Sequence, residues 1–210
     1  AVENRGNAPR GEGGKDDRDI GRGEATGRPQ RQRRALSDDD VSLAKDMVVL
    51  ETKAALILNK PPGLATQGGT KTTRHVDGLL DAYAGEDDPR PRLVHRLDKD
   101  TTGVMVVAKT DVAAAHLGKQ FADRTIRRRY LALVWGFFSD EKGTVNEPLA
   151  RHPKDRLRFA VMPKGKRAVT HWRVIDRAHF KASGGMGHLT LVECRLETGR
   201  THQVRVHMSH

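Results

Sequence analysis

The segment LVHRLDKDTTGVMVVAKT, Leu93–Thr110, decides how the fold is read, because it joins a charged loop directly to a short apolar run. The run Val104–Ala108 is continuous and rich in β-branched residues, which predicts a strand buried on both faces. The next residues, Asp111–Phe121, have the pattern of a helix with a favourable negative charge near its start. The segment therefore predicts a loop, a strand and a helix in succession, with the carboxylate of Asp98 in the loop.

Further strands are expected on both sides of this unit. Residues 48–60 read as a strand, a turn and a second strand, Ala54–Asn59, ended by two prolines and a glycine. Three more apolar runs predict the strands Tyr130–Gly136, Ala168–Ile175 and Leu189–Leu196. Helices are expected at Thr73–Tyr83, which has one apolar stripe, and after Thr201 as a cap, with Val204, Arg205 and Met208 on one face. The fold class that follows is α+β, with a mixed, largely antiparallel β-sheet and flanking helices.

The N-terminal part of the chain differs in composition from the rest. Residues 1–40 contain seven glycines, no aromatic residue and hardly any aliphatic one, so they cannot bury enough apolar surface to offset the entropy of ordering. We expect residues 1–47 to form a disordered tail or linker and residues 48–210 to form one folded domain, which begins near Val48.

The basic excess lies in the part that is expected to fold. The chain has a formal charge of +11 and a pI near 10.1, whereas residues 1–40 hold nine basic and nine acidic residues. This surplus favours a polyanionic partner, and RNA or another nucleic acid is the first expectation. The single cysteine, Cys194, suits a reducing compartment, and no apolar run approaches the ~20 residues of a membrane span. We expect a cytoplasmic protein with no membrane contact.

Asp98 is the first candidate for chemistry. The flanking cations Arg96 and Lys99 favour its ionised form, and a partly desolvated carboxylate is a competent nucleophile at a sugar carbon. The alternative is an exposed charge cluster without a role. A hydrolase of glycosides or nucleosides would need a second positioned carboxylate, and the sequence shows no clear companion to Asp98.

A second candidate segment is ETGRTHQVRVH, Glu197–His207, which concentrates basic and polar side chains. Arginine is preferred where an oxyanion or phosphate is held at two points, although a basic helix face is an equally simple interpretation. The histidines at 202, 207 and 210 lack the spacing of a zincin pair, and Cys194 has no cysteine partner. Neither a metal nor an organic cofactor is expected.

Taken together, these segments resemble a known family. LVHRLDKDTTGVMVVAKT and TGRTHQVRVHMSH resemble two signature segments of the RluA-type family of RNA pseudouridine synthases. LNKPPGLATQGGT and RRRYLALVWG are similar to other segments of that family, in the same order along the chain. The resemblance covers about Val48–His210, and QGGTKTTRHVDGLLDAY resembles the RluC-like branch, which acts on large-subunit ribosomal RNA. The resemblance implies the pseudouridine synthase catalytic fold and isomerisation of uridine without a cofactor.

The resemblance also implies roles for individual residues. Asp98 would attack the ribose or, in another mechanism, the base. Tyr130 would stack on the target base, and Arg205 would pair with Asp98. Arg96 would fill the space that the flipped uridine leaves. Contacts to RNA phosphates would come from basic residues on several segments, namely Lys60, Arg127, Arg128, Arg129 and Arg200.

Three departures from the family pattern are visible. Thr102 stands where serine is usual, and Arg128 stands where many members have lysine. The family continues beyond the equivalent of His210, so we expect a catalytic domain whose C-terminal part is missing, and RluC-like members carry a small RNA-binding domain near the N-terminus. The alternative function is a non-catalytic RNA-binding or ribosome-assembly protein on the same scaffold. The presence of Asp98 favours the enzyme, because binding alone does not need this carboxylate.

Overall fold

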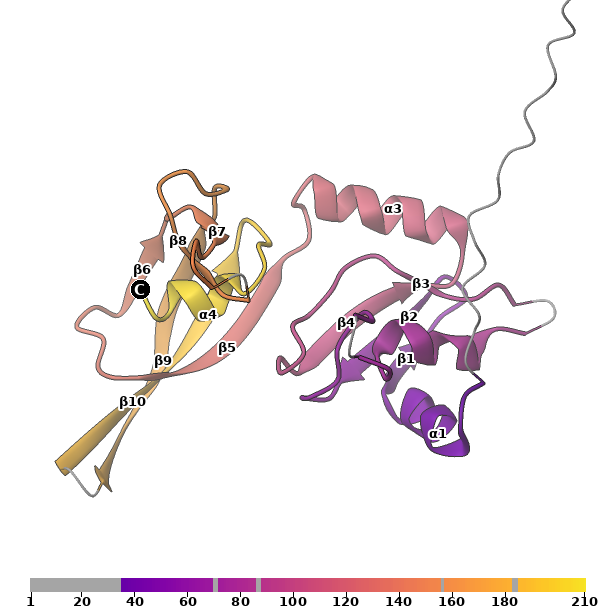
Figure 1. Ribbon diagram of the computed structural model, residues 1–210, viewed down its shortest axis with the longest axis horizontal. Coiled ribbons are helices and arrows are strands. Elements are labelled where there is room, and N and C mark those ends of the chain that lie inside the picture. Colours follow the sequence, from indigo (N-terminus) through magenta and orange to yellow (C-terminus); the bar gives the residue numbers. More distant parts are fainter. Residues whose placement is uncertain (1–34, 70–71, 86–87, 156, 183–184) are drawn as a thin grey trace, which may run out of the picture. The chain divides into compact units, whose positions relative to one another are not determined.

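The computed structural model describes residues 35–210 except 70–71, 86–87, 156 and 183–184 (Figure 1). Most of the expected tail, residues 1–34, therefore lies outside the described residues. One four-stranded antiparallel sheet has the order β1-β2-β4-β3, formed by β1 (Val48–Glu51), β2 (Ala55–Lys60), β4 (Gly103–Ala108) and β3 (Arg92–Leu93). The predicted pair of strands before Pro61 and the predicted strand at 104–108 are confirmed, and they are neighbours in this sheet.

The hydrophobic core lies on one face of this sheet. Leu56 and Leu58 of β2 stand opposite Val107 and Met105 of β4, and all four side chains are fully buried. Three helical segments cover this face, namely α1 (Asp38–Asp46), α2 (Val76–Leu79) and the 3-10 helix η1 (Leu80–Tyr83). The apolar stripe predicted for 73–83 is thus the side of α2 and η1 that packs on the sheet.

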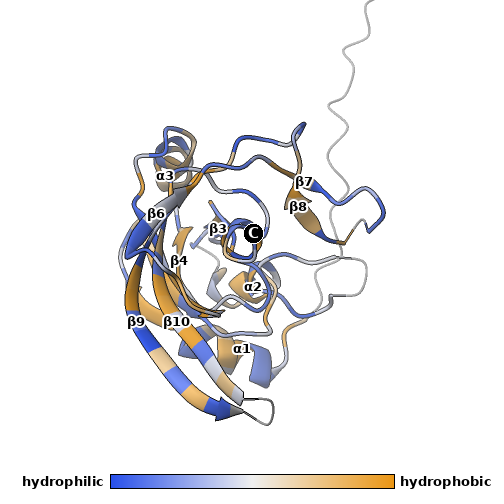
Figure 2. Cartoon of the chain, turned by 90° about the vertical axis from the view of Figure 1, so that its left-hand side faces the viewer, coloured by the Kyte–Doolittle hydropathy of each residue, from blue (hydrophilic) through white to orange (hydrophobic). Residues whose placement is uncertain are grey.

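A second four-stranded antiparallel sheet has the order β5-β10-β9-β6. Its strands are β5 (Arg128–Trp135), β10 (Gly185–Leu196), β9 (Thr170–Ala182) and β6 (Lys142–Val145). Polar and apolar residues alternate along β9 and β10, as Figure 2 shows, and the two strands continue as a long ribbon. The short strands β7 (Leu149–Arg151) and β8 (Phe159–Val161) form a third, two-stranded sheet. The α+β class with largely antiparallel sheets is confirmed.

Two further helices complete the described elements. Helix α3 (Asp111–Ala122) follows β4, as predicted, and its cap is Thr110, whose hydroxyl accepts the N–H of Ala113 at 3.1 Å. Helix α4 (Gln203–His207) is shorter than expected and begins after His202, so the prediction that Thr201 caps it is wrong. Among the described residues, no helix combines the length and apolar character that crossing a membrane requires.

Two other expectations need correction. Val104 is 70% exposed, so the outer face of β4 is open at this position, although Ala108 at the other end of the same face is fully buried. Helix α1 lies inside the segment 1–47 that was assigned to a tail. Its start has the capping box of Ser37 and Asp40, and Ala44 together with Met47 enters the core, which explains why this part is ordered.

Candidate functional site

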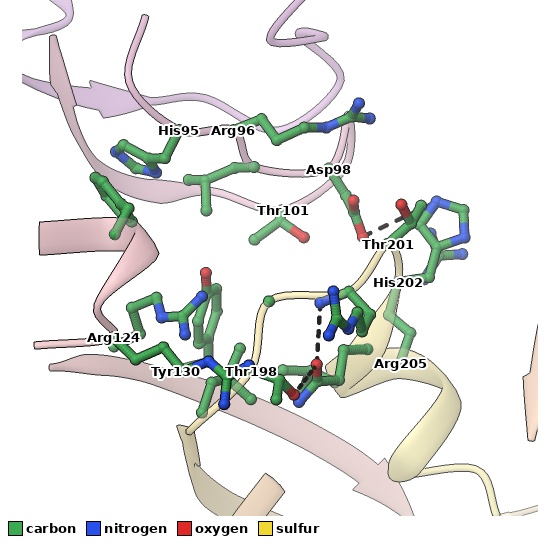
Figure 3. Close-up of a pocket in the computed structure, with 18 of the residues that line it drawn as sticks. His95, Arg96, Asp98, Thr101, Arg124, Tyr130, Thr198, Thr201, His202 and Arg205 are labelled. Carbon is green, nitrogen blue, oxygen red and sulfur yellow. Dashed lines mark hydrogen bonds and ion pairs between the residues drawn. The ribbon is translucent and has the colours of Figure 1, made fainter. Parts of the chain in front are cut away.

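A pocket of about 560 Å³ brings together the two segments that the sequence singled out. It is lined by residues 94–98 and 101 from the loop before β4, by residues 196 and 198–205 around the start of α4, and by parts of α3 and β5. In Figure 3, His95, Arg96 and Asp98 lie along one side of the pocket, and Arg124, Tyr130 and Thr198 lie along the other. The volume is within the range of about 300–1,000 Å³ that is typical of sites for small ligands.

The backbone on both sides of Asp98 is held by buried polar side chains. The hydroxyl of Thr66 donates to the carbonyl of Leu97 at 2.7 Å and accepts the N–H of the same residue at 3.1 Å. After Asp98, the carbonyl of Lys99 accepts a bond of 2.9 Å from the ammonium of Lys60. Both Thr66 and Lys60 are buried, so these bonds form away from water. The carboxylate, with a side chain that is 19% exposed, is therefore presented to the pocket by a rigid loop.

Lys60 is not placed as a phosphate contact, and the predicted role is corrected here. Its side chain is fully buried, and its ammonium donates to three carbonyls, those of Pro61, Leu64 and Lys99, at 2.7–2.9 Å. All three protons of the ammonium are used. Burial lowers the pKa of Lys60, and the nearby carboxylates of Asp100 and Asp98 partly counter this effect. The residue ties the loop of Asp98 to the end of β2.

The side chain that faces Asp98 from α4 and its preceding loop is a histidine. His202 Nε2 lies 4.0 Å from Asp98 Oδ2, and the ring of Phe159 meets that of His202 edge to face at 5.7 Å. The expected ion pair between Arg205 and Asp98 is not formed among the described residues, although Arg205 does line the pocket. Arg205 is an exposed residue of α4, and no described ion pair joins its guanidinium to the carboxylate of Asp98.

The loop opposite Asp98 is organised by one buried amide. Gln203 is 2% exposed, and its Oε1 accepts bonds from the Thr198 hydroxyl at 2.8 Å and from the N–H of Arg200 at 3.0 Å. Its Nε2 donates to the carbonyl of Val169 at 2.9 Å and to the hydroxyl of Thr170 at 3.0 Å. Both donors and both acceptor positions of the amide are thus satisfied. The loop between β10 and α4 is fixed at two points.

The same network continues through His207 and defines its tautomer. His207 Nε2 lies 3.0 Å from the carbonyl of Glu147, which can only accept, so Nε2 carries the proton. Nδ1 then accepts from the hydroxyl of Thr170 at 2.9 Å, while that oxygen accepts from Gln203. Burial lowers the pKa of His207, which agrees with a neutral ring. This histidine is a structural residue.

Five arginines surround the single carboxylate among the lining residues that the structure describes: Arg96, Arg124, Arg128, Arg200 and Arg205. None of the five forms an ion pair within the described part of the chain. Arg128 approaches the loop closely, because a Cβ on Gly199 would lie 2.3 Å from its Nη1, and its Nη2 donates to the carbonyl of Glu197. Of the other predicted phosphate contacts, Arg127 and Arg129 do not line the pocket, and Arg129 lies 4.0 Å from Glu193.

Two side chains of the pocket are held in their uncharged forms. Tyr130 packs against the core, and burial raises the pKa of its hydroxyl, with Asp98 acting in the same direction and Arg128 opposing. The phenol is therefore protonated at neutral pH. His95 stacks on Phe121 at 4.7 Å, and burial together with the charge of Arg128 lowers its pKa to about 4. Neither of these two side chains therefore carries a charge in the pocket at neutral pH.

Metal and thiol chemistry find no support in these side chains. Across the described ranges, no group of three or more histidines, cysteines and carboxylates could hold a metal ion. Cys194 is buried in β10, and burial, with a smaller effect of Glu193, raises the pKa of its thiol to about 11. At neutral pH this group is a protonated thiol, so it is a poor nucleophile.

Sequence reasoning missed several residues that shape the site. Thr66 and Gln203 act through buried hydrogen bonds, and nothing in their neighbourhood in the sequence indicates which backbone groups they meet. His202 was considered as a metal ligand and as one of the residues of segment 197–207, but not as a neighbour of Asp98. Arg124, just after the end of α3, was not considered at all, although the sequence places it three residues before the basic run at 127–129.

Comparisons with known proteins agree with this geometry. The profile described as RNA pseudouridylate synthase matches residues 54–210. The chain is 46% identical over 171 residues to the ribosomal large subunit pseudouridine synthase D of Zymomonas mobilis, covering 77% of this chain and 51% of that protein. It is 45% identical over 170 residues to the protein of the same name from Escherichia coli, covering 78% of this chain and 48% of the relative. The chain thus spans about half the length of these curated relatives.

Solved structures show the same fold. The human RNA pseudouridylate synthase domain containing 4 superposes with a TM-score of 0.62 and 27% identity, covering 81% of this chain and 67% of that one. The human RNA pseudouridylate synthase domain containing 1 gives a TM-score of 0.64 at 24% identity, with 77% and 63% covered, and supports the fold alone. Because the family profile spans every strand but β1, together with α3, α4 and all residues that line the pocket, the chain belongs to the RNA pseudouridylate synthase family.

Proposed function

We propose that this chain carries the catalytic site of an enzyme that converts uridine to pseudouridine in RNA, with large-subunit ribosomal RNA as the substrate class. The observation that carries the proposal is the single carboxylate of Asp98, held by a rigid loop in a pocket with five arginines. The arginines suit the phosphates of RNA, and the carboxylate suits chemistry at the ribose. The names of the two curated relatives support the substrate class.

In the proposed reaction, a carboxylate oxygen of Asp98 bonds to C1′ of the uridine while the N1–C1′ bond breaks, and the electron pair stays on the uracil. The uracil turns within the pocket. C5 then displaces the carboxylate at C1′, the proton on C5 is removed, and N1 gains a proton. The protonated Tyr130 lines the pocket and is proposed to stack on the base. No redox partner or cofactor is needed for this isomerisation.

Access to a base within a helix requires that the nucleotide leaves the stack, at a cost of a few kcal/mol. Arg96 is exposed on the same loop as Asp98 and lines the pocket, so it is proposed to occupy the vacated space. Arg128 and Arg200 are proposed to bind phosphates, and Arg205 to reach Asp98 when RNA is bound. The RluC-like branch and a cytoplasmic location also remain proposals.

The test is the substitution Asp98→Asn, which keeps the size of the side chain and removes its negative charge. Conversion of uridine in unmodified large-subunit ribosomal RNA should fall below detection, while RNA binding stays within about twofold of the wild type. Asp100→Asn is the matched control, since Asp100 is exposed and does not line the pocket. Turnover by Asp98→Asn would refute the nucleophile, and binding without turnover by the wild-type chain would favour the non-catalytic RNA-binding alternative.

A further inference from the structure

Two residues other than glycine have a left-handed backbone among those that the structure describes. They are Arg124, with φ of 59°, and His202, with φ of 56°. Both line the same pocket, although they come from different parts of the chain. Left-handed conformations are unfavourable for residues with a Cβ, and such strain concentrates at functional sites. The ring of His202 faces Asp98, whereas Arg124 takes no part in the proposed reaction.

The local geometry shows that glycine would suit position 124 better. Helix α3 ends at Ala122, Asp123 is its cap, and Arg124 follows as the residue that turns the chain. The N–H of Arg124 donates to the carbonyl of Phe121 at 3.4 Å, and the N–H of Thr125 donates to that of Gln120 at 3.1 Å. This pair of bonds is the Schellman motif, whose left-handed residue is usually glycine. Arginine therefore stands at a turn position where glycine is usual.

The charge of Arg124 also lacks compensation in this structure. No carboxylate within the described part of the chain pairs with it, and Asp98 is the one acidic residue that lines the pocket with it. Burial lowers the pKa of Arg128, and the nearby like charge of Arg124 acts in the same direction. Two neighbouring guanidinium groups without a counter-ion form a site that an anion with several oxygens would stabilise.

We propose that Arg124 is a further substrate-binding residue, which contacts a phosphate of the RNA beside the nucleotide that enters the pocket. This inference rests on the proposed RNA substrate. A helix C-terminus attracts a cation in its own right, but that attraction does not require the side chain to line a pocket with other arginines. A phosphate contact explains three features of Arg124 together: its place in the pocket, its unpaired charge and its unfavourable left-handed backbone.

The decisive variant is Arg124→Gly, because it separates binding from folding. Glycine relieves the left-handed conformation, so the melting temperature should stay within about 2 °C of the wild type or rise. The affinity for unmodified large-subunit ribosomal RNA, measured by filter binding at fixed salt, should fall about tenfold, as expected for one lost charge-assisted contact. The slope of log K against log salt should become shallower by about 0.7–0.9.

Two further variants make the comparison specific. Lys119→Gln removes one positive charge from the same helix at a position that does not line the pocket, and should change the affinity less than twofold. Arg124→Lys keeps a charge at the turn and should recover most of the lost affinity. If Arg124→Gly does not fold, Arg124→Asn replaces it, because asparagine also tolerates the left-handed region.

The outcomes separate this inference from the proposed function. Equal binding by Arg124→Gly and the wild type would overturn the inference, as would an equal loss in Lys119→Gln. The binding measurement does not depend on turnover. A wild-type chain that binds RNA but forms no pseudouridine would refute the proposed reaction. The role of Arg124 in binding could still be decided in that case. A tenfold loss confined to Arg124→Gly, with recovery in Arg124→Lys, supports the phosphate contact.

Discussion

His95 must be uncharged in the folded protein. Its Nε2 lies 3.0 Å from the N–H of Val106 and accepts a hydrogen bond from it, which a doubly protonated ring cannot do. Burial and the charge of Arg128 lower its pKa from 6.5 to about 4. The ring also stacks on Phe121 of α3, so this residue joins the loop of Asp98 to β4 and to α3.

A pH dependence of stability follows from this pKa. The unfolded chain takes up a proton on His95 as the pH falls through 6.5, whereas the folded chain does so only near 4. The free energy of unfolding should therefore fall by about 2 kcal/mol between pH 7.5 and 5 through this residue, and level off below about pH 4. Urea unfolding of the wild type and of His95→Gln checks this, since the variant should lack that part of the dependence.

His116 provides the control for this measurement. It lies exposed on α3, so His116→Gln should leave the pH dependence close to that of the wild type. An equal dependence in His95→Gln and the wild type would show that His95 is not held neutral by its hydrogen bond to β4.

At the level of elements, helix α1 shows how local signals and tertiary contacts combine. The Ser37 hydroxyl accepts the N–H of Asp40 at 3.2 Å, and the Asp40 carboxylate accepts the N–H of Ser37. Arg74 pairs with Asp40 at 2.7 Å, and the hydroxyl of Tyr83 donates to the carbonyl of Ala44. The helix is short and polar in composition, so these contacts, rather than a strong apolar pattern, position it on the core.

The capping box of α1 can be tested by Ser37→Ala. This change removes the acceptor for the N–H of Asp40 and should lower the free energy of unfolding by about 1 kcal/mol. Ser42→Ala, in the exposed middle of the same helix, should change it by less than about 0.5 kcal/mol. Chemical denaturation of both variants measures the difference. Equal stability of Ser37→Ala and the wild type would mean that α1 contributes little to the fold.

Among the elements, strands and helices with a clear period were predictable, whereas short strands and the polar helix α1 were not. The sequence pattern located β2, β4, α3 and β5 to within a few residues. It missed α1 and also β3, β6, β7 and β8, whose two to four residues pair with partners from elsewhere in the chain. The cap of α4 was also misplaced, since the left-handed His202 precedes the helix and no side-chain hydrogen bond caps its start.

At the scale of the whole molecule, the net charge of +11 and the arginines of the pocket both favour binding to a polyanion. If the five arginines neutralise about five phosphates of single-stranded RNA, the affinity should fall about 100-fold between 50 and 200 mM salt. Filter binding over a salt series measures this slope. A flat salt response would contradict a polyanionic substrate, whereas a steep response that persists with a random RNA would show that the charge provides affinity without site choice.

The sequence by itself determined the family, the antiparallel α+β class and the basic surplus, and it singled out Asp98 as the candidate for the reactive carboxylate. These follow from patterns of neighbouring residues and from motifs in a fixed order, which are local properties of a chain. Tertiary structure alone decided that Lys60 is buried under three carbonyls, that His202 rather than Arg205 faces Asp98, and that Arg124 shares the pocket. Burial and distance depend on contacts between segments that are up to a hundred residues apart, and no short stretch of sequence contains them.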